Sequence, residues 1–266
     1  MSQPNIEEVI KKFQDLTKAW SKSNKDVQYC ENAVKSLRLD LIKFAYLPTN
    51  EVKATRRELL IARDTLEIAA YLALEKKDTA TFTDIISQLK PYYLDYKDSL
   101  PDAPHKYELL GLNLLRLLAE GKLAAFHTEL EWLSKEEIEG NIYINHPVSM
   151  EQYLMEGNFH KLFLSKSNVP SEKYNFFVDI LLNTVRGEIS SVISSAYNEL
   201  KLEDATKLLM LRTPEECKAY GSSQKWKLEN NVYRFEKSKE HKEDDVAAKD
   251  VIQVMLDYTK ELDQII

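Results

Sequence analysis

The chain has 266 residues, of which 44% are hydrophobic and 30% charged, and its formal net charge is −7. This length and composition allow one large or two modest buried cores and exclude a miniprotein or a disordered tail. With only six glycines and eight prolines, the chain favours long helices with short joints over a glycine-rich nucleotide-binding fold. Since an acidic surface with interspersed charges repels a phosphate backbone, we expect no nucleic-acid partner.

The sequence also indicates a soluble intracellular protein. Its two cysteines, Cys30 and Cys217, provide no disulfide framework. The N-terminal residues MSQPNIEEVI lack the basic and apolar regions of a secretory signal. No apolar run approaches the roughly 20 residues that span a bilayer, so we expect no membrane partner.

Six amphipathic helices are expected in the first half of the chain, because apolar residues recur there three and four positions apart. The expected helices cover residues 6–20, 27–44, 59–73, 79–90, 107–119 and 123–133. Pro91 is expected to end the fourth helix, and Gly121 to form the turn between the last two. Cys30 lies on an apolar face, which predicts a small buried side chain rather than a reactive thiol.

Two of these helix pairs repeat one pattern. Shifting the chain by about 44 residues places Phe82 on Phe126 and Ile86 on Leu130, and a period of this size is typical of helix-pair repeats. Such repeats stack into a short solenoid whose outer surface is available to partners. Because the match is degenerate, an irregular helical bundle is the alternative.

Shorter elements are expected next. Ser134 and Glu137 have the spacing of a capping box, and Gly140 is expected to end the short helix that follows. The expected elements after it are an extended segment or loop at 141–144 and helices over 149–156, 159–164 and 171–184. Pro147 fits the first turn of the helix that it precedes.

The following region has the element order of a winged helix, which is three helices and a β-hairpin. The expected helices cover 188–200, 203–211 and 213–220, and the expected strands cover 225–228 and 232–235. Thr213 caps the third helix, Pro214 lies in its first turn and Gly221 ends it. A DNA-reading third helix presents basic or amide side chains to the bases, whereas Glu215 and Glu216 make this one acidic.

Base readout is therefore not expected from this module. Lys225, Lys227 and Arg234 on the hairpin leave only a weak basic spot. A winged helix that does not read DNA, placed after a helical array in an acidic chain, favours protein assembly.

The C-terminal residues predict an amphipathic helix that follows a charged linker over 236–250. Its apolar face, a candidate interaction surface, consists of Val251, Ile252, Met255, Tyr258, Leu262, Ile265 and Ile266. Such a helix docks either on its own domain or on partner helices. The pattern alone leaves both alternatives open.

The five histidines form no catalytic or metal-binding pattern. His127 and Glu131 are four residues apart, as two ligands on one helix face are, but no second histidine completes a zinc motif. The remaining histidines, His105, His146, His160 and His241, are isolated. The chain also lacks a P-loop sequence and a nucleophile elbow. We therefore expect no enzyme activity, no cofactor and no metal.

Several strings of residues are similar to one known family. The longest is HPVSMEQYLMEG at 146–157, and others lie at 62–68, 88–97, 111–115 and 126–131. They resemble the non-ATPase subunit 8 family of the proteasome regulatory particle, the small PCI-domain subunits of its lid. The resemblance runs from about residue 55 to about residue 210.

This resemblance implies a mainly α fold, in which a TPR-like helical-repeat array is followed by a winged-helix (PCI) module and a C-terminal helix. In that family, PCI domains associate through their winged helices, and the C-terminal helices of the lid subunits gather into one bundle. The implied partners are other lid PCI subunits, that helical bundle and the base of the regulatory particle. The resemblance therefore favours partner docking by the terminal helix.

Three parts are expected from this organisation. They are a helical-repeat array over 1–140, a helical linker with the winged helix over 141–238, and a charged linker with a docking helix over 239–266; a PCI domain as usually drawn covers about 70–240. The implied function is that of a non-enzymatic assembly subunit supporting ubiquitin-dependent protein degradation in the cytoplasm and nucleus. The alternatives are a PCI subunit of a translation-initiation or signalosome complex with weak RNA contact, and an enzyme with an unrecognised metal site.

Overall fold

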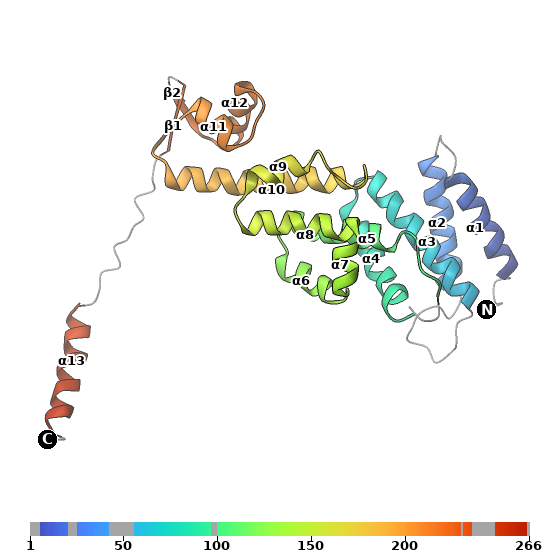
Figure 1. Cartoon of the computed structure of the whole chain (residues 1–266), viewed down its shortest axis with the longest axis horizontal. Coiled ribbons are helices and arrows are strands. Elements are labelled where there is room, and N and C mark those ends of the chain that lie inside the picture. The colour runs from blue at the N-terminus through green and yellow to red at the C-terminus, as the bar shows by residue number, and fades with distance from the viewer. Residues whose placement is uncertain are drawn as a thin grey trace. The chain divides into compact units, whose positions relative to one another are not determined.

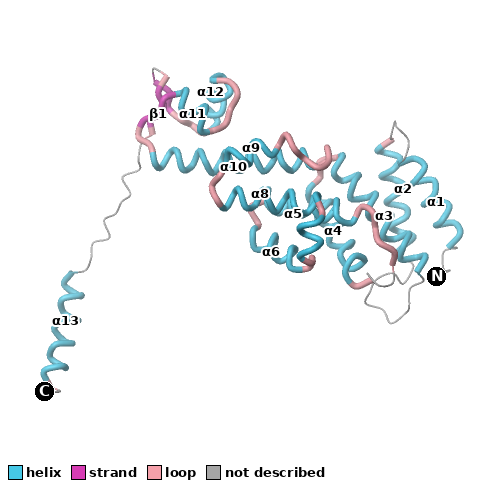
Figure 2. The backbone as a smooth tube through the Cα atoms, viewed as in Figure 1, coloured by secondary structure: helices cyan, strands magenta, loops and turns pink. Residues whose placement is uncertain are grey.

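The computed structural model describes residues 6–20, 26–42, 56–96, 100–229, 231–235 and 248–264. The chain divides into two compact units, residues 1–186 and 187–266. Helices dominate both, and the described strands form one small sheet (Figure 2). The predicted mainly α fold is confirmed. The three-part division at residues 140 and 238, drawn from sequence pattern rather than from compactness, stays a prediction.

The first unit is a series of helices, most of them packed on the next helix in chain order (Figure 1). These helices are α1 (Ile6–Trp20), α2 (Val27–Ile42), α3 (Arg56–Glu75), α4 (Thr79–Leu94), α5 (Lys106–Ala119), α6 (Leu123–Glu131), α7 (Lys135–Gly140), α8 (Ile142–Met155), α9 (Phe159–Ser165) and the first part of α10 (Tyr174–Ala196). α5 packs on α4, α6 and α8, and its residues from Gly111 to Ala119 are all buried. Because neighbouring helices cover it on several sides, α5 is the centre of this unit.

One type of tight turn joins three of the helix pairs, α3–α4, α5–α6 and α8–α9. In each turn, one residue has a positive φ, which is 59° at Lys77, 71° at Gly121 and 69° at Gly157. The N–H of this residue donates a hydrogen bond to the carbonyl three residues earlier. The N–H of the following residue donates to the carbonyl five residues before that following residue. These bonds are 2.8–3.1 Å long. This is the Schellman arrangement. The first two turns are 44 residues apart, as the helix-pair repeat predicts, and α8–α9 adds a pair outside that match.

Three predicted helix boundaries are wrong because a proline or a glycine is tolerated inside a helix. α4 continues past Pro91 to Leu94. Pro91 has no N–H to donate to the Ser87 carbonyl, but this loss is tolerated because Ser87 is exposed. Gly221 lies inside α12 (Pro214–Ser223). A side chain at residue 221 would come within 2.8 Å of the Tyr233 hydroxyl, so this glycine serves close packing rather than helix termination.

The third wrong boundary concerns the segment expected at 141–144, of which residues 142–144 are helical and only Asn141 is extended. Asn141 caps α8 by accepting a hydrogen bond from the Tyr143 N–H (3.0 Å), so Pro147 lies inside the helix. A proline cannot donate to the carbonyl four residues earlier. The freed carbonyl, that of Tyr143, accepts a hydrogen bond from the Tyr174 hydroxyl of α10 instead (3.2 Å).

The second unit is a winged helix. It contains the rest of α10, β1 (Glu199–Lys201), α11 (Leu202–Leu208), α12, β2 (Lys227–Glu229), β3 (Val232–Arg234) and, after residues outside the described set, α13 (Ala248–Asp263). The antiparallel sheet has the order β1-β3-β2, with Tyr233 opposite both Leu200 and Leu228. The predicted hairpin and the Thr213 cap are confirmed.

The start of this module differs from the prediction. The helices expected over 171–184 and 188–200 are one helix, α10, which begins at Tyr174, passes through Gly187 and ends at Ala196. Residues 199–200, predicted as the end of the second of these helices, instead belong to β1, which is held extended by its pairing with β3. Leu200 and Tyr233 belong to the buried core, and the Tyr233 hydroxyl donates to the Cys217 carbonyl (3.0 Å).

Candidate interaction surfaces

The apolar face of α13 is exposed to solvent. The exposed fractions are 51% for Val251, 58% for Ile252, 68% for Met255, 64% for Tyr258 and 43% for Leu262. The two remaining predicted members, Ile265 and Ile266, lie outside the described residues. Exposed apolar patches of this kind mark interaction sites, and the assignment of this surface to a partner stays a prediction.

Two further residues of α13 belong to this surface, although the prediction omits them. Val254 is 68% exposed and Leu256 is 56% exposed. At 3.6 residues per turn they lie on either side of the predicted stripe and widen it to an arc of roughly 200°. The signal was available in the sequence, because both side chains are apolar, but a strict spacing of three and four excludes them.

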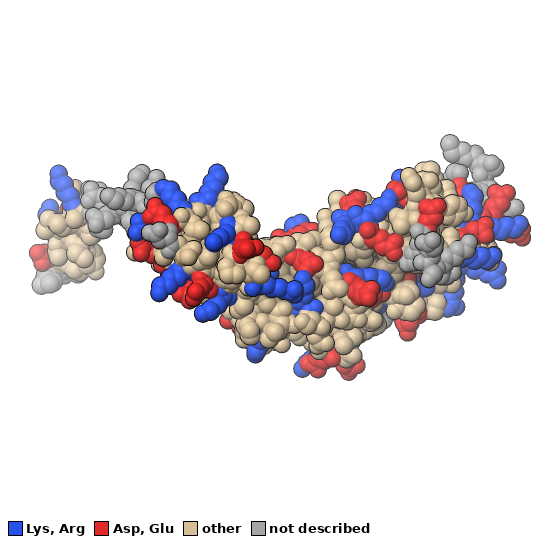
Figure 3. Space-filling view, turned by 90° about the horizontal axis from the view of Figure 1, so that it is seen from above, with Lys and Arg blue, Asp and Glu red and all other residues tan. Residues whose placement is uncertain are grey.

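The predicted basic spot on the winged helix is neutralised in part by its neighbours. Lys227 and Arg234 lie opposite each other on β2 and β3, and Lys225 lies in the turn before β2 with a φ of 60°. The guanidinium of Arg234 lies 3.1 Å from the Glu199 carboxylate and donates to Glu229 over 2.8 Å. The structure therefore places two acidic side chains beside Arg234. Positive and negative side chains are also interspersed over the face in Figure 3.

The histidines that the structure describes are dispersed. His127 lies 3.5 Å from Glu151, a residue of α8, His105 lies 3.9 Å from Glu108, and His160 is exposed on α9. His241 lies outside the described residues. Within the described part of the chain, no three His, Cys, Asp or Glu side chains gather closely enough to hold a metal ion.

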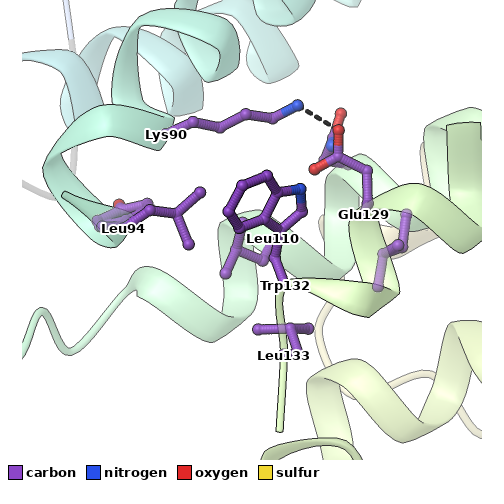
Figure 4. Close-up of a pocket in the computed structure, with 9 residues that line it drawn as sticks. Lys90, Leu94, Leu110, Glu129, Trp132 and Leu133 are labelled. Atoms are coloured by element: carbon purple, nitrogen blue, oxygen red, sulfur yellow. Dashed lines mark hydrogen bonds and ion pairs between the residues drawn. The ribbon is translucent and has the colours of Figure 1, made fainter.

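A small hollow between α4, α5 and α6 is drawn in Figure 4. Lys90 and Glu129 form an ion pair at its rim, and Leu94, Leu110 and Trp132 line it. Its volume is about 20 Å³, far below the several hundred cubic ångströms of a ligand site. This hollow is a packing defect beneath an exposed tryptophan, not a substrate pocket.

Buried charges stiffen the first unit. Glu67 accepts a hydrogen bond from the Tyr93 hydroxyl (2.8 Å), and burial raises the pKa of its carboxyl from 4.5 to about 7. Glu108 accepts from Tyr71 (2.6 Å) and lies 3.1 Å from the Lys173 ammonium. Burial acts to raise its pKa, but these two partners outweigh it, and the pKa is lowered. These carboxylates bind other side chains across helices, which is a structural role.

The family of the chain follows from its similarity to known proteins. Residues 104–246 match the CSN8/PSMD8/EIF3K family. The chain belongs to this family. Members of it that are similar to the chain include the 26S proteasome non-ATPase regulatory subunit 8 homolog A of Arabidopsis thaliana, at 34% identity over 99% of each chain. The 26S proteasome non-ATPase regulatory subunit 8 of Caenorhabditis elegans is 33% identical over 95% of this chain and 98% of its own.

The CSN8/PSMD8/EIF3K family membership confirms the resemblance found in the sequence. The 26S proteasome regulatory subunit RPN12 of Saccharomyces cerevisiae is also similar, with 27% identity over 95% of this chain and 98% of its own. These matches extend beyond residues 55–210 and include the winged helix. No described helix is both long and apolar enough to cross a membrane.

Proposed function

We propose that this member of the CSN8/PSMD8/EIF3K family is a non-enzymatic structural and assembly subunit of the proteasome regulatory particle lid, acting in ubiquitin-dependent protein degradation in the cytoplasm and nucleus. Relatives that match it over nearly their full length are named as 26S proteasome regulatory subunits. The observation that carries the proposal is α13, whose described apolar side chains are all exposed.

The width of this apolar arc indicates the kind of partner. An amphipathic helix that lies on one surface buries a stripe of little more than 100°, whereas α13 presents roughly 200°. Contact from two sides is what a helical bundle provides. Burying about seven such side chains stabilises a complex by on the order of 10 kcal/mol, before the costs of ordering and association. The proposed partners of α13 are therefore the C-terminal helices of other lid subunits.

The winged helix offers a second proposed contact. β1 and β2 are the edges of its three-stranded sheet, and all three residues of β2 are exposed. An edge strand presents unpaired backbone groups to which another chain can add. We assign this edge to neighbouring PCI subunits of the lid. A further contact with the base of the regulatory particle is part of the proposal, without an assigned surface.

The RNA-contacting alternative is less well supported. It requires a basic surface, but Arg234 is paired with Glu199 and Glu229, and the first turn of α12 carries Glu215 and Glu216.

Deletion of residues 251–266 tests the proposal. We expect the truncated chain to fold and to lose incorporation into the lid by about tenfold or more, because its apolar arc is gone. Native mass spectrometry of lid purified through another tagged subunit measures the occupancy. The matched control is Q253A/K260A, which changes only the polar side of α13. Full occupancy by the truncated chain would show that the helix is not a docking element.

A further inference from the structure

A third candidate surface is formed by residues of the first unit alone. It is an open groove of about 450 Å³, which we call the α8–α9 groove. One wall is a single face of α8, which includes Ile142, Asn145, Ser149 and Tyr153. The other wall comes from α9 and the turn after it, through Lys161, Leu164 and Asn168.

The dimensions of the groove suit a short extended segment. The face of α8 that lines it extends from residue 142 to residue 153, which is about 16 Å at 1.5 Å per residue. An extended chain advances about 3.3 Å per residue. The groove therefore has room for about five residues of a bound strand.

The polar lining favours an extended backbone over a helix. Asn145, Ser149 and Asn168 carry amides and a hydroxyl, which both donate and accept hydrogen bonds. The Ser149 hydroxyl donates to the Asn145 side-chain oxygen (3.1 Å), and this leaves the Asn145 amide hydrogens for a ligand. A bound helix satisfies its own backbone groups, whereas an extended segment presents free N–H and C=O groups that such side chains can pair.

The charge of the groove differs from that of the whole chain. The formal net charge of the chain is −7, yet none of the residues lining the groove is acidic, and Lys161 is its one lysine or arginine. Its ammonium lies over the Tyr153 ring, 5.6 Å from the centroid, and forms no ion pair with a described residue. The half-buried ring of His146, which also lines the groove, adds no charge, because burial lowers its pKa.

Exposed apolar side chains flank this positive charge. Ile142 on one wall is 67% exposed, and Leu164 on the other is 59% exposed. They can contact aliphatic side chains that alternate along an extended segment. We propose that the α8–α9 groove binds an extended segment of a partner protein, which places an acidic side chain on Lys161 and aliphatic side chains against Ile142 and Leu164.

Selection of displayed peptides on the isolated full-length chain tests this proposal independently of lid incorporation. A library of short linear peptides is selected on the native protein after depletion on the bare support. We expect the recovered peptides to share an acidic residue next to aliphatic ones. By fluorescence anisotropy, a labelled recovered peptide should bind K161E about tenfold more weakly than the native chain, a loss that corresponds to one charge-assisted contact.

The matched control is K135E, which reverses an exposed lysine on α7 outside the groove, with 85% of its side chain accessible. We expect K135E to bind the same peptide within about twofold of the native chain, and L164D to weaken it as K161E does. Recovery of no peptide above background, equal binding to K161E, or a helical bound peptide by NMR would each overturn the proposal. Incorporation of the chain into the lid does not enter this test, so the two proposals can fail separately.

Discussion

α5 and α13 are helices of 14 and 16 residues with opposite surroundings. From Gly111 to Ala119, every residue of α5 is buried by the rest of the first unit, whereas every side chain described in α13 is exposed. The apolar residues of α5 are thus accounted for by contacts within the chain. Those of α13 are exposed, and the proposed docking assigns them to a partner.

Polar groups in the two helices show the same difference. The buried Arg116 of α5 donates to the Asn113 side chain (3.0 Å) and to Glu120 (2.8 Å), so its charge is satisfied within the helix. In α13, Lys260 and Asp257 lie 3.6 Å apart with most of their side chains in solvent, where such a pair contributes little. Substitutions in the first unit should therefore alter the stability of the fold, whereas substitutions in α13 should alter association with a partner.

The largest expected effect comes from Gly111→Ala. A Cβ at this residue would lie 2.3 Å from both the Tyr143 carbonyl and the Tyr174 hydroxyl, which bond to each other because Pro147 cannot donate to that carbonyl. Overpacking against backbone and loss of this bond should lower the free energy of unfolding by about 3 kcal/mol. Denaturant unfolding followed by circular dichroism measures the change.

Gly187→Ala is the matched control for that substitution. Gly187 also lies inside a helix, but nothing is within 4 Å of the position that its Cβ would take. Alanine has the higher helix propensity, so this variant should be more stable by about 0.5–1 kcal/mol. If both variants changed stability equally, close packing around α5 would not explain the glycine.

The second-largest effect concerns the buried Glu67 of the first unit, which should make the free energy of unfolding depend on pH. The pKa of Glu67 is about 7 in the folded chain instead of 4.5, so between these values the folded state binds more protons than the unfolded state. The free energy of unfolding should then fall as the pH rises through this window, by about 3 kcal/mol at most. The substitution Glu67→Gln keeps a hydrogen-bond acceptor for Tyr93 and should remove this dependence of the free energy of unfolding on pH.

Glu137→Gln provides the control for the pH profile, because the pKa of Glu137 shifts the other way. The Ser134 N–H holds it down to about 2, so its contribution is present above pH 4.5 and lost as the pH falls toward 2. The two variants should therefore change opposite ends of the profile in urea unfolding at a series of pH values. An unchanged slope above pH 4.5 in E67Q would show that Glu67 titrates normally.

Apolar spacing and capping residues predicted the helices of the array and the order of the winged-helix elements, because these signals are local. The spacing of Ser134 and Glu137 gave the capping box that the structure contains. Pro147 was misplaced because the group that replaces its lost bond, the Tyr174 hydroxyl, lies on a distant helix. Likewise, β1 is extended because it pairs with β3, and its own residues carry no strand signal.

The candidate surfaces were predictable to the same degree. The stripe on α13 could be read from its spacing, and its width from the additional apolar residues. The α8–α9 groove could not be predicted, because residues 141–144 were expected to form an extended segment or a loop, and Ile142 and Asn145 then have no common face with Ser149. The ion pair between Arg234 and Glu199 could not be predicted either, because Glu199 lies on β1, a strand that the sequence does not predict.

The smallest expected effect on folding comes from the wider arc of α13. Val254→Asp and Leu256→Asp replace exposed side chains, so each should change the free energy of unfolding by less than about 0.5 kcal/mol. Both should nevertheless reduce lid incorporation as strongly as Met255→Asp, because a helix inside a bundle is contacted on both sides of its stripe. Native mass spectrometry gives the occupancy. If only Met255→Asp reduced it, α13 would lie on one flat surface rather than in a bundle, and the roughly 200° arc would overstate its contact.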